Sequence, residues 1–260
     1  MLGGMLMDTH AHINFDSFDA DREDMLARAR AAGVEKIICI GMQPQGGREA
    51  LELARKYPGQ VYASVGCHPY DAALLDDSCL AEFEALLREP QCVLMGEMGI
   101  DTVKAGVPLE VQERAFERQL ELAVALNKPV CIHSREAFRH VERVITRVCP
   151  GGYRGFAHCF SDGALEARRW RELGFLVSFA GQVTFKNAQS LREAARALTP
   201  DDVVLETDCP FLAPMPHRGK RNEPAYTRLT AQCLADLWGL PLEEVARRTS
   251  ANAARMLGLE

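Results

Sequence analysis

The feature of this sequence that most constrains its fold is a repeated alternation of short apolar runs with longer amphipathic stretches. Short runs rich in β-branched and other apolar residues are typical of buried strands, whereas apolar residues at helical spacing indicate helices that cover a sheet. The pattern predicts eight strands, at residues 7–13, 36–41, 61–66, 93–96, 129–132, 155–157, 176–180 and 203–207.

Helices are expected between these strands, for example at residues 21–32, 109–126 and 164–173, and a further helical pair at 225–238 and 241–257 closes the chain. Gly33 and Gly174 stand where C-capping glycines are expected. Eight βα units in 260 residues match the size of a TIM (β/α)8 barrel. An open doubly wound sheet alternates in the same way, but no Gly-x-Gly-x-x-Gly turn follows the first strand. We therefore expect an α/β fold in which residues 1–260 form one TIM barrel.

Composition limits the partners and the compartment. The formal charge of −6 argues against a surface coated in positive charge for duplex binding, so any contact with nucleic acid must be local. The nine cysteines include no Cys-x-x-Cys pair, and most, such as Cys39, Cys92 and Cys131, lie in apolar runs, which fits a reducing compartment. Residues 1–7 contain neither a signal peptide nor a membrane span, so we expect a cytoplasmic protein.

His10 and His12 form a His-x-His pair at the end of the first predicted strand. Alternate residues of a strand point to the same face, so both imidazoles can reach one metal ion. A structural role is the alternative for each, but two histidines in an apolar strand cost burial free energy unless they have partners.

Four further polar residues stand at the ends of other predicted strands: Glu97, His133, His158 and Asp208. Each is costly inside a barrel but fits its C-terminal rim, where the active sites of this fold lie. Imidazole and carboxylate ligands suit zinc, magnesium, manganese or nickel, and a carboxylate can bridge two ions about 3.5–4 Å apart. The sequence thus predicts two divalent metal ions at one rim.

Three other residues are interpreted as structural. Cys159 and Cys209 adjoin predicted ligands but would point to the opposite face if the strand pattern continued, so we expect them to pack. His140 falls within a helix and is expected at the surface.

The motifs MDTHAH, GCHP, GEMGID, IHSR, HCFSD and LETDCPFLAPMPHRGKRNEP resemble, in order, the signatures of TatD-type deoxyribonucleases, a family of metal-dependent hydrolases. The resemblance runs from residue 7 to the C-terminus. It implies that His10, His12, Glu97 and Asp208 hold one ion and that Glu97, His133 and His158 hold the other, with Glu97 bridging. It also implies hydrolysis of DNA phosphodiester bonds by a metal-activated water.

The resemblance further implies that four residues contact a substrate phosphate: His68, Arg135, His217 and Arg218. Together with Lys220 and Arg221, His217 and Arg218 form the densest positive cluster in the chain, although Lys220 and Arg221 also fit a solvated loop. Asp208 is expected to orient the water and accept its proton, while His68, Arg135 or Arg218 stabilise the developing charge.

Some positions depart from the family pattern. Thr102 and Val103 replace a frequent tyrosine pair, Asp162 replaces a common glycine, and Cys209 stands where serine is usual. The departures spare the expected ligands but remove an obvious platform for base stacking.

Two other functions remain open from the sequence. The first is an esterase or deacylase of the same barrel superfamily, for example on an aminoacyl-tRNA linkage, although many such enzymes have lysine at the position of Glu97. The second is a binding module that keeps its metals for stability alone. We expect DNA as the partner, through local contacts in a pocket, with neither a membrane nor an obligate protein partner.

Overall fold

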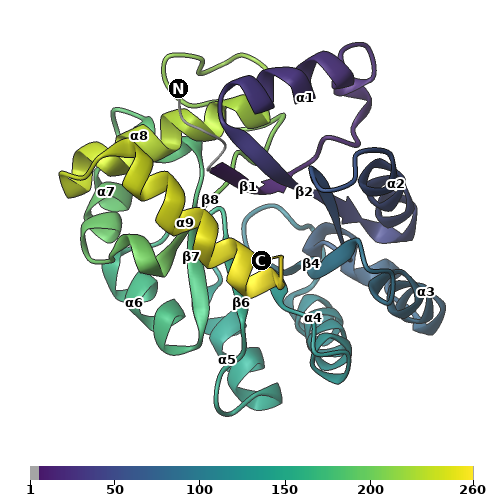
Figure 1. The fold of residues 1–260 in the computed structure, drawn as a ribbon. Helices are drawn as coiled ribbons and strands as arrows, with labels where there is room; N and C mark the ends of the chain where they lie inside the picture. Colours follow the sequence, from purple (N-terminus) through teal and green to yellow (C-terminus); the bar gives the residue numbers. More distant parts are fainter. Residues whose placement is uncertain (1–5, 260) are drawn as a thin grey trace.

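Eight parallel strands pair in the order in which they occur in the chain and form a nearly closed barrel (Figure 1). The structure is a computed structural model that describes residues 6–259. The strands are β1 Leu6–Ala11, β2 Val34–Met42, β3 Val61–Gly66, β4 Cys92–Asp101, β5 Val130–Arg135, β6 Gly155–His158, β7 Phe175–Phe179 and β8 Val203–Leu205. The predicted TIM-type barrel is therefore confirmed.

Helices follow the strands and surround the barrel. They are α1 Arg22–Ala31, α2 Gln43–Lys56, α3 Asp77–Leu87, α4 Leu109–Ala125, α5 Phe138–Val148, α6 Ala164–Glu172, α7 Gln189–Arg196, α8 Thr227–Trp238 and α9 Leu242–Leu257. Short 3-10 helices lie in the connections: η1 Asp16–Phe18, η2 Pro69–Leu74, η3 Gly181–Thr184, η4 Pro200–Asp202 and η5 Pro224–Tyr226. Gly33 and Gly174 follow α1 and α6 with φ of 91° and 95°, the conformation expected of C-capping glycines.

Most strands differ from the predicted bounds by one to three residues at an end, and the differences at β4 and β8 bear on the site. β4 continues through Glu97 to Asp101 instead of ending at Gly96, because its register shifts between Met95 and Met98 and pairing with β5 then resumes. β8 ends at Leu205, two residues early, and the chain beyond it is held to β1 by isolated contacts.

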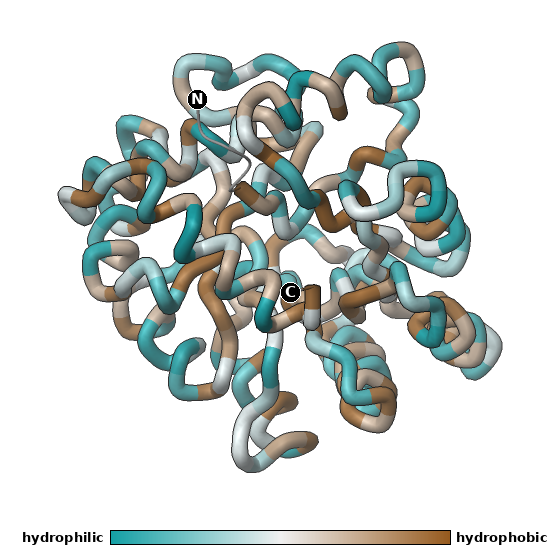
Figure 2. Tube along the Cα trace, viewed as in Figure 1, coloured by the Kyte–Doolittle hydropathy of each residue, from teal (hydrophilic) through white to brown (hydrophobic). Residues whose placement is uncertain are grey.

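The core consists of two layers. The larger cluster fills the space between the outer face of the sheet and the helices, and in Figure 2 brown, hydrophobic segments accordingly lie along the strands and recur along the helices. The smaller cluster fills the barrel interior and includes Met7, Ile40 and Phe156 together with Ala253 and Leu257 of α9. Helix α9 thus covers one end of the barrel, so the site must lie at the other end (Figure 1).

Ion pairs connect successive helices around the barrel. They are Glu23–Lys56 between α1 and α2, Arg48–Glu82 between α2 and α3, Asp77–Arg118 between α3 and α4, Glu117–Arg147 between α4 and α5, and Glu142–Arg169 between α5 and α6. Exposed pairs of this kind contribute little individually. Each of them neutralises one cation on the outer surface of the barrel.

None of the nine cysteines, all of which lie within residues 6–259, forms a disulfide. Over the same residues no helix has both the length and the apolar content that crossing a membrane requires. His140, expected at the surface, is half-buried and lies 3.0 Å from Glu113 across the α4–α5 interface.

The packing of α6 predicts a large cost for truncating its one tryptophan. Trp170 is 1% exposed, and its ring meets those of Phe138 and Phe175 edge to face. Trp170→Ala should lower the free energy of unfolding by about 3–5 kcal/mol, because a cavity replaces these contacts. Leu165→Ala is the matched control, since Leu165 lies on the same helix but is 76% exposed. Denaturant titration of both variants measures the difference, and equal stability would refute the packing role.

Candidate active site

The six residues predicted as metal ligands converge at the C-terminal end of the barrel, where β1, β4, β5, β6 and the segment after β8 meet. They are His10, His12, Glu97, His133, His158 and Asp208. His10, His12, Glu97 and His158 are buried, whereas the side chains of His133 and Asp208 are 16% and 14% exposed.

The first group surrounds the Nε2 atom of His10. This atom lies 3.2 Å from Nε2 of His12, 3.3 Å from Oε2 of Glu97 and 3.7 Å from Oδ1 of Asp208, and Asp208 Oδ1 lies 3.3 Å from His12 Nε2. The alternation of the strand therefore brings the His-x-His pair to one point, as predicted.

The second group surrounds the other oxygen of Glu97. Oε1 lies 2.7 Å from Nδ1 of His133 and 3.4 Å from Nε2 of His158. Glu97 thus presents one oxygen to each group, which is the geometry that a bridging carboxylate requires.

Glycines on β3 and β4 permit the close approach of strands that this geometry needs. Gly99 has φ of 146°, and a Cβ there would stand 2.0 Å from the carbonyl oxygen of His133. A Cβ at Gly66 would stand 2.7 Å from Cα of Gly96, next to Glu97. Any larger residue at these positions would push β4 away from a neighbour that carries or flanks a candidate ligand.

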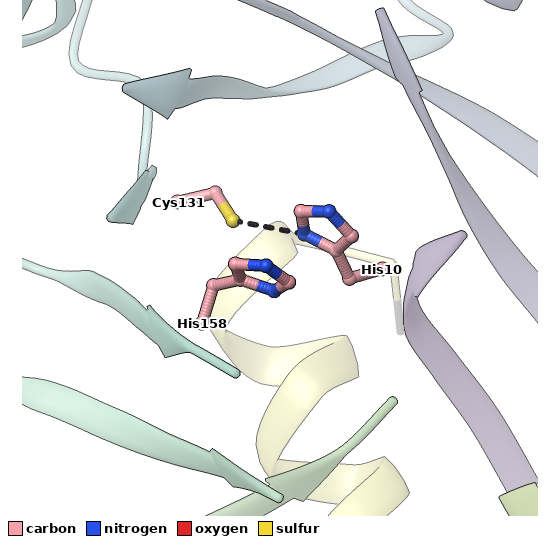
Figure 3. Close-up of side chains that lie close together, drawn as sticks. All are labelled: His10, Cys131 and His158. Carbon is pink, nitrogen blue, oxygen red and sulfur yellow. Dashed lines mark hydrogen bonds between the residues drawn. The ribbon is translucent and has the colours of Figure 1, made fainter. Parts of the chain in front are cut away.

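Hydrogen bonds orient three of the imidazoles. His158 Nδ1 donates to Glu206 at 3.0 Å, His133 Nε2 donates to Asp101 at 3.1 Å, and Nδ1 of His10 faces the sulfur of Cys131 at 3.3 Å. Figure 3 shows the last of these, with the ring of His158 stacked on that of His10. When the outer nitrogen carries the proton, the inner nitrogen offers its lone pair to a metal ion.

These orienting partners were missed by sequence reasoning. One signal was present for Glu206: it stands two residues before Asp208 at the end of a buried run, so the alternation of a strand places both on one face. Asp101 and Cys131 carried no comparable signal, because their roles depend on the neighbouring strands.

The electrostatics of the site favour bound cations. Burial favours the neutral acid, but the imidazoles of His158, His68 and His10 outweigh it and hold the pKa of Glu97 well below its usual value. Burial and the neighbouring His158 lower the pKa of His10 to about 3, so His10 is neutral, as a ligand must be. Burial also opposes protonation of His158, but Glu206 and Glu97 dominate and raise its pKa to about 10. The position between His158 and Glu97 therefore attracts positive charge strongly.

The donor atoms also fit metal ions by their spacing. Nitrogen and oxygen atoms that bind one ion tetrahedrally at about 2.0–2.2 Å lie about 3.3–3.6 Å apart. The separations of 3.2, 3.3 and 3.7 Å in the first group lie within or about 0.1 Å outside this range. In addition, the buried Nε2 atoms of His10 and His12 face each other, an arrangement that a shared cation satisfies better than a hydrogen bond between two neutral rings.

A cavity of about 1030 Å³ opens above these residues. His68, Arg135 and Arg218 line it, as the sequence predicted for substrate contacts. His217 does not line it: the ring of His217 stacks on Tyr226, with centroids 4.2 Å apart. Of the other two cations in this loop, Lys220 lines the cavity, whereas Arg221 pairs with Asp21 at 2.7 Å.

His68 is disposed to donate a hydrogen bond rather than to bind a metal ion. Its Nδ1 accepts from the backbone N–H of Tyr70 at 3.2 Å, so a neutral ring carries its proton on Nε2. That Nε2 lies 3.4 Å from Glu97 Oε1 and faces the cavity.

The prediction for Cys159 was wrong. Its backbone has φ of 47°, so the strand alternation ends at His158, and the thiol turns toward the site instead of away from it. The sulfur lies near His158, Asp208 and Gln182, and Cys159 lines the cavity. Cys209 packs as predicted, since it is fully buried in the core.

Comparison with known proteins assigns the family. The model of TatD-related DNases matches residues 7–258, nearly the whole chain. The chain belongs to this family. The crystal structure of YJJV, a TatD homolog from Escherichia coli K12, superimposes on this barrel with a TM-score of 0.93. The two sequences are 28% identical, and the match covers 100% of both chains.

The curated relatives within the family are named as hydrolases of two kinds, metal-dependent hydrolases and exonucleases. The relative named uncharacterized metal-dependent hydrolase YabD, from Bacillus subtilis (strain 168), is 38% identical over 97% of this chain and 98% of its own length. The relative named 3'-5' ssDNA/RNA exonuclease TatD, from Erwinia tasmaniensis, is 31% identical over 98% of this chain and 100% of its own length. This member of the TatD-related family is therefore a metal-dependent hydrolase.

The hydrogen bond from His158 to Glu206 yields a prediction about metal affinity. Glu206→Gln replaces an acceptor for the Nδ1 proton with a neutral amide, so the affinity for Mn²⁺ should fall about 10–100-fold. Glu121→Gln is the control, because Glu121 is exposed on α4, away from the site. Calorimetric titration with Mn²⁺ measures both variants. Identical affinities in the two would show that Glu206 does not orient a ligand.

Proposed function

We propose that this protein hydrolyses phosphodiester bonds in single-stranded DNA or at frayed DNA ends, with two divalent cations held by the clustered imidazoles and carboxylates. One observation carries the proposal. The floor of the cavity holds a cluster that fits metal ions, while its walls carry cations that pair with no carboxylate among residues 6–259. An anionic substrate that also contacts metal ions fits such a cavity.

The wall cations come from three segments of the chain. They are Lys104 after β4, Arg135 at the end of β5, and Arg218 and Lys220 in the long connection after β8. Arg218 also lies over the ring of Phe185, 4.4 Å from its centroid, which holds the guanidinium at the wall. Phosphate oxygens are the natural acceptors for such donors.

Aromatic side chains at the mouth supply platforms for bases. Phe211 is 50% exposed and Tyr70 is 40% exposed, and both line the cavity together with Phe15 and Phe185. They come from elements other than the segment that lacks the family's tyrosine pair, so the loss of that pair leaves stacking surfaces in place.

The residues divide the chemistry among them. Divalent cations held at the cluster would withdraw electrons from the phosphoryl group and lower the pKa of a water molecule. Asp208, whose carboxylate faces the cavity more than that of Glu97, orients the attacking water and accepts its proton. As the water oxygen bonds to phosphorus and the bond to the leaving oxygen breaks, Arg135, Arg218 and the Nε2–H of His68 stabilise the phosphoryl oxygens.

The name of the Erwinia relative, 3'-5' ssDNA/RNA exonuclease TatD, supports this substrate class. End-labelled single-stranded DNA incubated with magnesium, manganese or zinc tests the proposal directly. Hydrolysis of a carboxylic ester without cleavage of DNA would favour an esterase or deacylase instead, and metal binding without any turnover would favour a binding module.

Replacing the proposed base predicts a loss of rate without loss of fold. Asp208→Asn should lower kcat by about 10²–10⁴-fold at saturating metal, because the amide cannot accept the water proton. Glu97→Ala should abolish turnover, since it removes the shared ligand of both groups. Circular dichroism checks that both variants fold, and wild-type kcat in Asp208→Asn would exclude Asp208 as the base.

The shape of the cavity predicts the strand preference. The loops that carry His68, Arg135 and Arg218 enclose the cluster in a concave pocket that admits one strand but obstructs a rigid duplex. Hairpins with a 3′ overhang should therefore be cleaved at the overhang faster than in the stem. Equal rates at the free end and in the duplex interior would contradict this preference.

A further inference from the structure

A second groove joins the site cavity on one side. It has a volume of about 800 Å³ and runs between η1 with the start of α1 on one side and α2 on the other (Figure 1). Phe15, Met42 and Asp71 line both the groove and the site cavity, so the two are continuous. A chain that crosses the active site can extend either over the site cavity's basic wall or along this groove.

The charge of the groove is opposite to that of the site cavity wall. Its lining carboxylates are Asp16, Asp19, Glu49, Glu52 and Asp71. Its two cations are already engaged: Arg22 donates to Asp19 at 2.6 Å, and Lys56 pairs with Glu23 at 3.0 Å. Asp16, Glu49, Glu52 and Asp71 have no cation within ion-pair distance among residues 6–259. The groove therefore presents uncompensated negative charge.

The wall of the site cavity, in contrast, carries uncompensated positive charge. Within the described part of the chain, Lys104, Arg135, Arg218 and Lys220 have no carboxylate partner. Five of the cations elsewhere around the barrel pair with a carboxylate of a neighbouring helix. Among the residues that line the two cavities, the free cations therefore lie on the sector formed after β4, β5 and β8, and the free carboxylates lie on the sector formed after β1, β2 and β3.

From this asymmetry we propose that the acidic groove between η1 and α2 prevents a nucleic-acid strand from continuing past the metal cluster, so that only a strand end can be cleaved. The inference rests on the proposed function. It adds the residues that restrict cleavage to the end of a strand. Phosphates of the bound strand follow the basic wall, where each meets a free cation. A strand without ends must pass phosphates along the groove as well, where they meet like charge at short range in a partly enclosed space.

The test compares three substrates at low ionic strength with Mn²⁺. They are a linear single-stranded DNA, the same sequence closed into a circle, and bis(p-nitrophenyl) phosphate, a small diester that is too short to enter the groove. The wild-type protein should hydrolyse the small diester and the linear strand but cleave the circle at a rate lower by about a hundredfold.

The decisive variant is Asp16→Asn/Glu49→Gln/Glu52→Gln, which removes three carboxylates outside the metal cluster. Cleavage of the circle should rise at least about tenfold, while hydrolysis of the small diester stays within about twofold. The matched control, Glu110→Gln/Glu121→Gln/Glu243→Gln, removes the same charge from exposed positions away from both cavities and should leave circle cleavage unchanged.

Salt separates electrostatic exclusion from steric obstruction. The difference between the wild type and the triple variant should shrink as salt is raised, because the screening length falls to about 8 Å at 0.15 M. A steric barrier would show no such dependence. If the triple variant fails to fold, the single substitution Glu52→Lys at an exposed position should raise circle cleavage in the same direction.

Three outcomes overturn the inference while the proposed function stands: a wild type that cleaves the circle as fast as the linear strand, a triple variant that remains unable to cleave the circle, or a difference between the two proteins that does not depend on salt. A wild type that hydrolyses neither the linear strand nor the small diester with any of the cations defeats the proposed function itself, and the inference falls with it.

Discussion

The contact on which the rest of the structure depends is the junction between β1 and the segment after β8. The carboxylate of Asp8 accepts hydrogen bonds from the backbone N–H and the hydroxyl of Thr207, at 2.9 and 2.6 Å. Beyond it, Asp208 N–H donates to the carbonyl of His10, and His12 N–H donates to that of Cys209. β8 is too short to continue the ladder, so a buried side chain takes over part of the pairing.

This junction also assembles the first metal group. The same hydrogen bonds hold His10 and His12 beside Asp208, although most of the chain separates them in sequence. The contacts that close the barrel therefore also bring these candidate ligands together. Because the residues sit on rigid paired backbone rather than on free loops, the donor atoms can be held at the spacing that a metal ion requires.

Burial determines how strongly the site attracts cations. In water, four imidazoles and two carboxylates would attract cations weakly, but here most of them lie in an enclosed floor above an apolar interior that α9 covers. Charge–charge interactions are stronger in such surroundings, and Glu97 remains ionised because imidazoles surround it. The mouth of the site cavity, in contrast, is exposed to solvent. There, the arrangement of free cations and free carboxylates determines which anionic chains can approach.

What the sequence by itself determined was local. Strand alternation predicted the eight strands, the common direction of His10 and His12, and the six candidate ligands, because a side chain's face depends only on its position in its own strand. Tertiary structure alone decided the hydrogen bonds of Glu206, Asp101 and Cys131 to ligand rings, the turn of Cys159 into the cavity, and the stacking of His217 on Tyr226 away from it. It also decided which charges stay unpaired at the mouth. The physical reason is that the hydrogen bonds and the charge pairing depend on distances between segments far apart in the chain, which are set only when the barrel closes. The turn of Cys159 and the stacking of His217 depend on backbone conformations outside the strands, which strand alternation does not describe.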